Sequence, residues 1–226
     1  MLRRPAVNNL SKGDWMKRIV HHLVLGLSVV IVAQAHAGPG IQVHPATFVG
    51  KAGECGPTAG TAIVTAAWLD GAGLPDDAAA DNDRRQGLLL SKNGPTADCS
   101  AAAAWISGVK NLVIGPGFTF GYDARIGTHC SGGAPRFNVR TTTGLHFVGA
   151  CTNATTEPAP ADTQWIRATM DPFDPAHSFP AFQAGEVIES VQIIFDEGTD
   201  AGPGAGLAVI DNIRIGDKIS GARNEH

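Results

Sequence analysis

Four acidic residues near the end of the chain have the chemistry of a cation site. Asp196, Glu197 and Asp200 follow one apolar run, and Asp211 lies inside the next one, residues 207–215. Residues two apart in a strand share a face, so Asp211 falls in an apolar row, where an unpaired charge is costly to bury. Carboxylate oxygens suit a hard cation. These four residues are therefore candidate ligands of a structural calcium ion. The alternative, which we favour, is that Asp211 caps the hairpin by accepting backbone N–H bonds while the other three acids face solvent.

Aromatic side chains are the second group with recognisable chemistry, because flat rings stack on the apolar faces of sugar rings. We take Tyr122, Trp165 and Trp105 as candidate ligand-binding residues. A sugar platform requires at least two exposed and coplanar rings among these three residues and Trp68.

The segment 171–185 contains three prolines and the phenylalanines Phe173, Phe179 and Phe182. Exposed on a loop, these rings would bind a ligand. Folded back, they would cover one end of the fold, which is the interpretation we favour.

The sequence does not point to a catalytic centre. It lacks the motifs GxSxG and HExxH. His129 and Cys130 are adjacent, so on a strand they point to opposite faces. Paired carboxylates for glycoside hydrolysis need a defined separation in a cleft, which spacing along the chain does not give. An enzyme is therefore the least favoured class and no catalytic residue is assigned, although the glutamates available to a hydrolase are Glu157, Glu186, Glu189 and Glu197.

The N-terminus has the pattern of a secretory signal. Lys17 and Arg18 precede an apolar run over 23–32, and a small-x-small motif over 35–37 precedes Gly38. We expect residues 1–37 to be a signal peptide and the protein to be secreted or periplasmic, with no membrane span in the mature chain. Removing these residues takes away five of the 17 Lys and Arg residues and one of the 21 acidic residues, which leaves 12 and 20 and a net charge of −8. This acidic balance disfavours nucleic-acid binding.

All four cysteines lie beyond the expected cleavage site, and an even number in an exported chain favours disulfides. No two are spaced as CxxC, and the histidines are scattered, which argues against a zinc site. Four cysteines allow three pairings. Extended runs over 118–151 predict an antiparallel meander with Cys130 and Cys151 at its rim, so we prefer that disulfide and pair Cys55 with Cys99 by default.

The rest of the chain consists of short strand-like runs separated by turns. Residues 61–69 fit a helix or a strand, whereas 101–109, despite four alanines, is expected to be extended because glycines bound it. The strongest strand patterns, 187–195 and 207–215, are expected to form a long-looped hairpin. We count about eight to ten strands, typical of an all-β fold built as a single antiparallel, jelly-roll-like β-sandwich. The expected organisation is a loosely ordered lead-in with an edge strand over 38–60, the sandwich over 61–216 and a tail over 217–226.

The closing residues, VIDNIRI after VQIIFDEGTD, resemble the last strands of bacterial secreted jelly-roll modules, including carbohydrate-binding modules. In many of those modules the first Asp of this pattern ligates a structural calcium, a role that the resemblance gives to Asp211. The stretches GLLLSKNGPTADCS and HCSGGAPRFNV also look like parts of uncharacterised exported bacterial proteins. These resemblances cover about half of the chain that would follow the signal peptide.

The favoured function is that of an exported, non-catalytic β-sandwich that binds a carbohydrate, as a polysaccharide or a cell-surface glycan, or another cell-surface ligand. The alternative is a structural or interaction protein of the cell envelope without a small-molecule site. A glycan-active hydrolase comes third.

Overall fold

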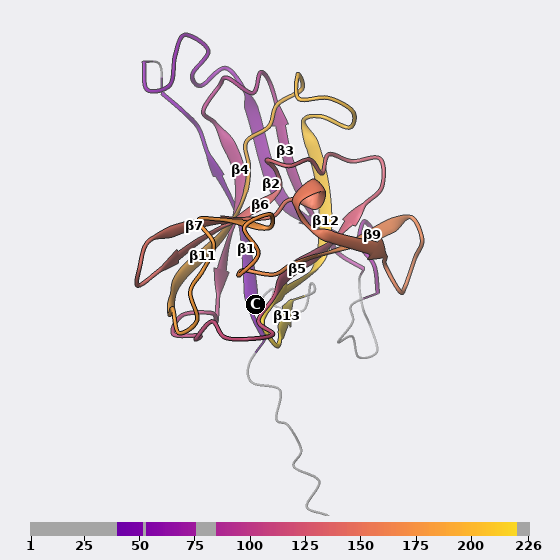
Figure 1. Ribbon diagram of the computed structural model, residues 1–226. Coiled ribbons are helices and arrows are strands. Elements are labelled where there is room, and N and C mark those ends of the chain that lie inside the picture. Colours follow the sequence, from indigo (N-terminus) through magenta and orange to yellow (C-terminus); the bar gives the residue numbers. More distant parts are fainter. Residues whose placement is uncertain (1–39, 52, 76–84, 221–226) are drawn as a thin grey trace, which may run out of the picture. The chain divides into compact units, whose positions relative to one another are not determined.

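The computed structural model describes residues 40–51, 53–75 and 85–220 (Figure 1). The expected signal peptide lies outside these residues. Within them the chain forms two antiparallel sheets packed against each other, as predicted, and no α-helix. The strands are β1 (Gln42–Phe48), β2 (Ile63–Leu69), β3 (Gly87–Asn93), β4 (Ala101–Ser107), β5 (Phe120–Arg125), β6 (Arg136–Thr141), β7 (Leu145–Val148), β8 (Thr155–Pro158), β9 (Trp165–Met170), β10 (Ser178–Phe179), β11 (Ile188–Phe195), β12 (Leu207–Ile215) and β13 (Lys218–Ser220), with one short 3₁₀ helix, η1 (Cys151–Asn153).

The strands divide between a six-stranded and a seven-stranded sheet. The first, sheet A, has the order β1-β4-β11-β6-β7-β10. The second, sheet B, has the order β2-β3-β12-β5-β9-β8, with β13 added to β12. Several consecutive strands, such as β3 and β4, lie in opposite sheets, so their connections close the ends of the sandwich.

The core fills the space between the sheets with alternate residues of each strand. Phe120 and Tyr122 from sheet B meet Phe137 from sheet A, with ring centroids 5.5 and 5.8 Å apart. The four alanines of β4 would favour a helix by propensity alone. The segment is a strand nevertheless, because it pairs along both edges, with β1 and with β11. The small alanine side chains leave room between the sheets for the large residues opposite.

The predicted meander over 118–151 is wrong in one respect. β6 and β7 form the expected hairpin, but β5 pairs with β12 and β9 in the other sheet. The cysteine pairing that the meander suggested is nevertheless confirmed. Cys130 is bonded to Cys151 and Cys55 to Cys99, with Cα atoms 5.3 and 5.7 Å apart.

The predicted hairpin of the two strongest strands is also wrong. β11 lies in sheet A between β4 and β6, and β12 lies in sheet B between β3 and β5. Their connecting loop therefore crosses from one sheet to the other at an end of the sandwich. Beyond it, residues 218–220 of the expected tail form β13, which extends the ladder of β12. The lead-in supplies β1, the expected edge strand.

A β-bulge changes which residues of β12 face the core. Its pairing with β5 shifts register between Asp211 and Arg214, and Asn212 has a φ of 45°. Ala208 and Ile210 face the core before the bulge, and Ile213 and Ile215 face it afterwards. The predicted single row from Leu207 through Asp211 to Ile215 is therefore broken, and Asp211 lies on the outer side of sheet B.

Candidate ligand-binding face

A row of side chains crosses the outer face of sheet A at one level. The backbone register aligns one residue from each of the six strands. From edge to edge this aromatic row consists of His44 of β1, Trp105 of β4, Gln192 of β11, Asn138 of β6, Phe147 of β7 and Phe179 of β10.

Strand alternation turns these side chains away from the core. The residues on either side of a row member point between the sheets, because neighbours in a strand face opposite ways. Trp105, for example, lies between Ala104 and Ile106, which are both in the core. Phe137 and Val139 flank Asn138 in the same way, and Val191 and Ile193 flank Gln192.

The three aromatic rings of the row are accessible to a ligand. Trp105 is 51% exposed, Phe147 39% and Phe179 74%. Trp105 and Phe179 are four strand steps apart, which corresponds to about 19 Å at the usual spacing of ~4.8 Å. This length exceeds one sugar ring, so the row suits a chain of linked units. Exposed apolar surface in such an arrangement is a common mark of an interaction site.

Polar groups lie between and beside the rings. Gln192 and Asn138 separate Trp105 from Phe147, and both amides donate and accept hydrogen bonds. The Asn138 Oδ1 atom is buried and has no hydrogen-bond partner among the described residues. The guanidinium of Arg136 lies 5.6 Å from the centroid of the Phe147 ring. The row therefore combines stacking surfaces with groups that hydrogen-bond to hydroxyls.

Only part of the predicted aromatic platform faces solvent. Trp105 does, as expected. Tyr122 is completely buried and donates its hydroxyl to the Pro135 carbonyl at 2.7 Å, while Trp165 is 4% exposed and packs with residues such as Leu74. Trp68 is partly buried and donates its ring N–H to Val43 at 3.0 Å. Tyr122 and Trp165 therefore cannot stack on a ligand, and burial between or against the sheets is the reason.

The three phenylalanines of segment 171–185 do not all face the same way. Phe182 is 5% exposed and packs on Phe120, and Phe173 is partly buried against the core, so both cover the end of the sandwich as predicted. Phe179 instead pairs with Phe147 and points outward. The sequence did not single out Phe147. Leu145 and Phe147 share one face of their strand and Val148 lies on the other, so the pattern does not say which face is buried.

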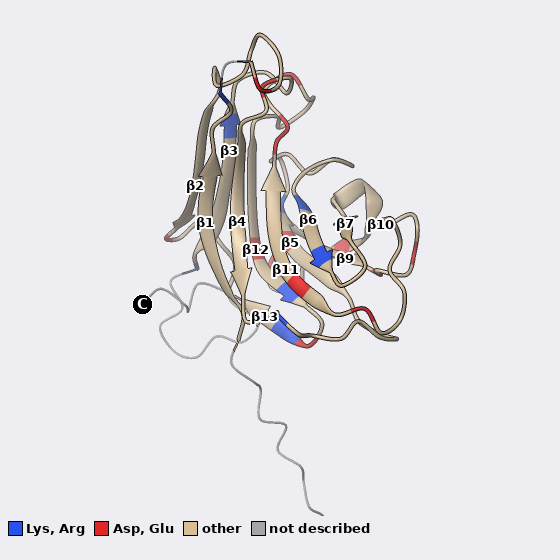
Figure 2. Ribbon diagram, turned by 90° about the vertical axis from the view of Figure 1, so that its left-hand side faces the viewer, with Lys and Arg blue, Asp and Glu red and all other residues tan. Residues whose placement is uncertain are grey.

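The end of the sandwich that carries three of the predicted metal ligands, Asp196, Glu197 and Asp200, also contains a buried cation, Lys92. Its ammonium nitrogen lies 3.2 Å from the Thr96 carbonyl and 2.6 Å from the Asp196 carbonyl, and it also donates to the Asp98 carbonyl. Burial lowers the pKa of Lys92, although the charges of Asp196, Asp98 and Asp200 act in the opposite direction. Acidic residues gather in the loops at this end (Figure 2, top).

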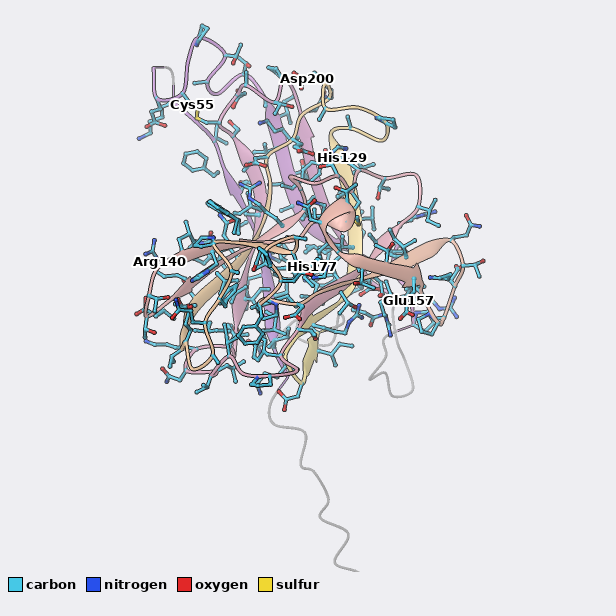
Figure 3. All side chains as sticks on the ribbon, in the orientation of Figure 1. Cys55, His129, Arg140, Glu157, His177 and Asp200 are labelled. Carbon is cyan, nitrogen blue, oxygen red and sulfur yellow. A yellow bond between two sulfur atoms is a disulfide. The ribbon has the colours of Figure 1, made fainter. Side chains whose placement is uncertain are left out.

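These three predicted metal ligands, Asp196, Glu197 and Asp200, have separate partners. Asp196 makes two 2.7 Å bonds to Arg136, and Asp200 accepts bonds of 2.7 and 2.6 Å from the backbone and hydroxyl of Thr96. Glu197 accepts from Ser131 at 2.6 Å and contacts His129. Figure 3 labels His129 and Asp200 toward the end of the sandwich that also carries Cys55. Among the described residues no group of three His, Cys, Asp or Glu side chains is arranged to hold a metal ion.

The contact of Ser131, His129 and Glu197 resembles a catalytic triad in composition but not in geometry. His129 and Ser131 both bond to the same oxygen of Glu197 rather than to each other. The Ser131 hydroxyl also accepts the Gly133 N–H at 2.9 Å, which fixes the turn after Cys130. A serine nucleophile needs its base on the hydroxyl, so this cluster organises a loop.

The carboxylate of Asp211 accepts backbone N–H bonds, as the alternative to a calcium site described. The residue is fully buried, and its carboxylate accepts the Leu74 N–H and its neighbour's, that of Asn212, each at 2.7 Å. Across the sheet it pairs in register with Asp123, which two arginines bind, Arg167 and Arg214, both at 2.9 Å. Burial would raise the pKa of Asp123, but these arginines outweigh it and hold that pKa below its usual range.

Comparisons of the chain with protein-family models, with curated proteins and with solved structures found no match. The two disulfides fit an oxidising compartment outside the cytoplasm. No helix in the described part of the chain is long and apolar enough to cross a membrane.

Proposed function

We propose that this chain is an exported, non-catalytic β-sandwich that binds a linear glycan along the aromatic row of sheet A. The observation that carries the proposal is the register that places Trp105, Phe147 and Phe179 in one line with two amides between them. Rings at intervals stack on successive sugar faces, and the amides bond the hydroxyls at ring edges.

The chemistry of the row favours a neutral ligand. Arg136 beside Phe147 is already paired with Asp196, so its charge is largely compensated. The row members themselves are aromatic, amide or histidine side chains. The net acidic charge expected of the exported chain also disfavours polyanionic glycans.

Binding is tested with the chain from residue 38 onward, by calorimetric titration with cellohexaose, xylohexaose and chitohexaose. At least one should bind, and Trp105→Ala, Phe147→Ala and Phe179→Ala should each weaken binding about two- to tenfold, the range expected for one aromatic contact. Phe48→Ala is the matched control. Its ring is 52% exposed at the end of β1, outside the row, so affinity should not change.

Two results would contradict the proposal. One is that no hexasaccharide binds. The other is that Phe48→Ala weakens binding as much as the row variants do. If no sugar binds and the protein instead dimerises with concentration, and the row variants abolish the dimer, the face is an interaction surface and the structural alternative is correct.

A further inference from the structure

One side chain beside the aromatic row, Arg136, has hydrogen-bond donors that the fold does not use. A guanidinium carries five N–H donors in one plane. Asp196 accepts two of them, from Nη1 and Nη2 at 2.7 Å each, and the Gly133 carbonyl accepts the second N–H of Nη1 at 2.9 Å. The Nε–H and the second N–H of Nη2 donate to no residue in the described part of the chain. These two donors are parallel and form the Nε edge of the guanidinium, which can bind two oxygen atoms at once.

The guanidinium belongs to the same face of sheet A as the aromatic row. Arg136 and Asn138 are two residues apart on β6, so both side chains point outward. Asn138 pairs in register with Phe147, and the guanidinium lies 5.6 Å from the centroid of the Phe147 ring. The side chain of Arg136 is 20% exposed, so a ligand can reach it. A stacking ring, an amide and two unused donors therefore meet at one position of the row.

Arg136 is held in place before any ligand arrives. Its two bonds to Asp196 and its bond to Gly133 fix the plane of the guanidinium. Asp196 is anchored in turn, because its backbone oxygen accepts a hydrogen bond from the buried Lys92 at 2.6 Å. Donors that are already fixed lose little further conformational entropy when a ligand binds.

The charges around the Nε edge favour uncharged oxygen atoms over a carboxylate. Asp196 already binds the guanidinium through both of its carboxylate oxygens, and its side chain is 36% exposed beside the site. A carboxylate on the ligand would lie close to that of Asp196 and be repelled by it. Two hydroxyls on neighbouring carbons of a sugar ring present two acceptor oxygens side by side and carry no charge.

We propose that Arg136 is a specificity-determining residue of the aromatic row, and that its Nε edge binds two neighbouring hydroxyls of the sugar unit beside Phe147. This inference rests on the proposed function and names the class of glycan, one whose internal units keep a pair of free neighbouring hydroxyls. A 1,4-linked glucan or xylan has such a pair on carbons 2 and 3. Chitin has the same linkage as cellulose but carries an acetamido group on carbon 2, so its internal units lack the pair.

Calorimetric titration of the chain from residue 38 onward with cellohexaose and chitohexaose tests the assignment. The wild type should bind cellohexaose about tenfold more tightly, the effect of roughly one hydrogen bond from a charged donor. Arg136→Lys keeps a positive charge beside Asp196 but has no fork, so it should weaken cellohexaose binding about tenfold and chitohexaose binding less than about twofold. Circular dichroism checks that the variant is folded.

Arg140→Lys is the matched control. Arg140 lies on the same strand and the same face, two residues beyond Asn138 on the opposite side of the row. It is exposed, and no residue in the described part of the chain fixes its guanidinium. Arg140→Lys should therefore change the affinity for cellohexaose by less than about twofold.

A measurement on the wild type needs no substitution. In a ¹H–¹⁵N NMR spectrum the Nε–H signal of Arg136 should shift when cellohexaose is added and stay in place when chitohexaose is added. The Nε–H signal of Arg140 should respond to neither.

The outcomes separate this inference from the proposed function. If chitohexaose binds as tightly as cellohexaose, or if Arg136→Lys binds cellohexaose as the wild type does, Arg136 does not select the ligand, while the proposed function stands. An equal loss in Arg140→Lys would overturn the role of a fixed fork. If hexagalacturonate binds more tightly than cellohexaose and Arg136→Lys removes the difference, the Nε edge binds a carboxylate and the assignment to hydroxyls is wrong. If no hexasaccharide binds, the proposed function fails and this inference fails with it.

Discussion

The ammonium nitrogen of Lys92 lies 2.6 Å from the backbone oxygen of Asp196, the first residue after β11. Through its other two carbonyl contacts the same nitrogen binds the loop between β3 and β4. A fixed positive charge thus joins the connections of both sheets at one end of the sandwich. Three of the four acidic residues that the sequence suggested as calcium ligands lie at this end, whereas Asp211 lies further along β12, where it bonds to Leu74.

Replacing Lys92 with Met should destabilise the fold strongly. The substitution keeps most of the apolar stem but leaves three carbonyls without their donor and the nearby acids without their cation. The cost should be about 3–5 kcal/mol in free energy of unfolding, the range for breaking a buried charged contact. Urea unfolding measures it. Lys110→Met, at an exposed position, is the control and should change stability by less than ~0.5 kcal/mol; equal losses in the two variants would refute the role of Lys92.

Chelation provides a second test of the same end. Because an ammonium group stands among Asp196, Asp200 and Asp98, we expect the melting temperature to be unchanged by excess EDTA. A bound metal stabilises the native state by mass action, so its removal would lower the midpoint. A drop that added calcium reverses would restore the metal site that the sequence predicted.

The fold class, most strands and both disulfides could be predicted from the sequence, because alternation, turn residues and cysteine pairing are local or nearly local signals. The partner of each strand could not. β5 precedes β6 along the chain but pairs with β12, more than eighty residues away. No local sequence pattern predicts this pairing. The same limit explains why β11 and β12 were expected to pair with each other.

The candidate site was predictable only in part for a related reason. Trp105 could be chosen by residue type, and Phe179 could be considered as an exposed aromatic on a loop, whereas Phe147 becomes a candidate only when the register aligns it with them. Tyr122 looked equally suitable, since strand alternation does not say which face is buried. The burial of Lys92 could not be predicted either, because a lysine at the end of an apolar run usually points to solvent.

The burial of Tyr122 has a direct spectroscopic consequence, because it is the only tyrosine in the chain. Burial raises the pKa of Tyr122 well above its ordinary value of about 10. A pKa raised in the folded state stabilises the fold below the unfolded pKa, and this contribution is lost as the pH rises beyond it. Phenolate absorbance should therefore appear only together with alkaline unfolding, followed in parallel by circular dichroism. Ionisation near pH 10 in folded protein would show that the ring is accessible and would reopen its candidacy as a ligand contact.

Asp98 should make the fold sensitive to acid. Burial would raise the pKa of Asp98, but bonds from Ser100, Ala62 and Thr61 outweigh it and hold that pKa well below the usual range. A depressed folded-state pKa stabilises the fold above the unfolded value of about 3.9, and the contribution is lost as the pH falls below it. Asp98→Asn should thus be less stable than wild type at pH 7, with the difference shrinking below about pH 4.

Urea unfolding at several pH values checks this, with Asp217→Asn, at an exposed position, as the control. Other acids, such as Asp123, also have lowered pKa values, so the wild type should lose stability in acid as well. The comparison between variant and wild type isolates the part due to Asp98. A constant difference from pH 7 to pH 3 would contradict the assignment.

The bulge in β12 depends on Asn212 in two ways that substitutions can separate. Its backbone has a φ of 45°, where most residues with a Cβ are strained, and its side-chain amide donates to Asp123 at 3.1 Å. Asn212→Gly removes the hydrogen bond to a buried carboxylate, but glycine adopts the positive φ without strain. It should therefore lower the free energy of unfolding by about 1.5–3 kcal/mol. Asn212→Ala loses the same bond and adds about 1–2 kcal/mol of left-handed strain. Urea unfolding of both variants should therefore rank wild type, Gly and Ala in that order. Equal stability of the two variants would mean that the bulge relaxes without strain, and an Ala variant more stable than Gly would show that β12 can run without the bulge that turns Asp211 away from the core.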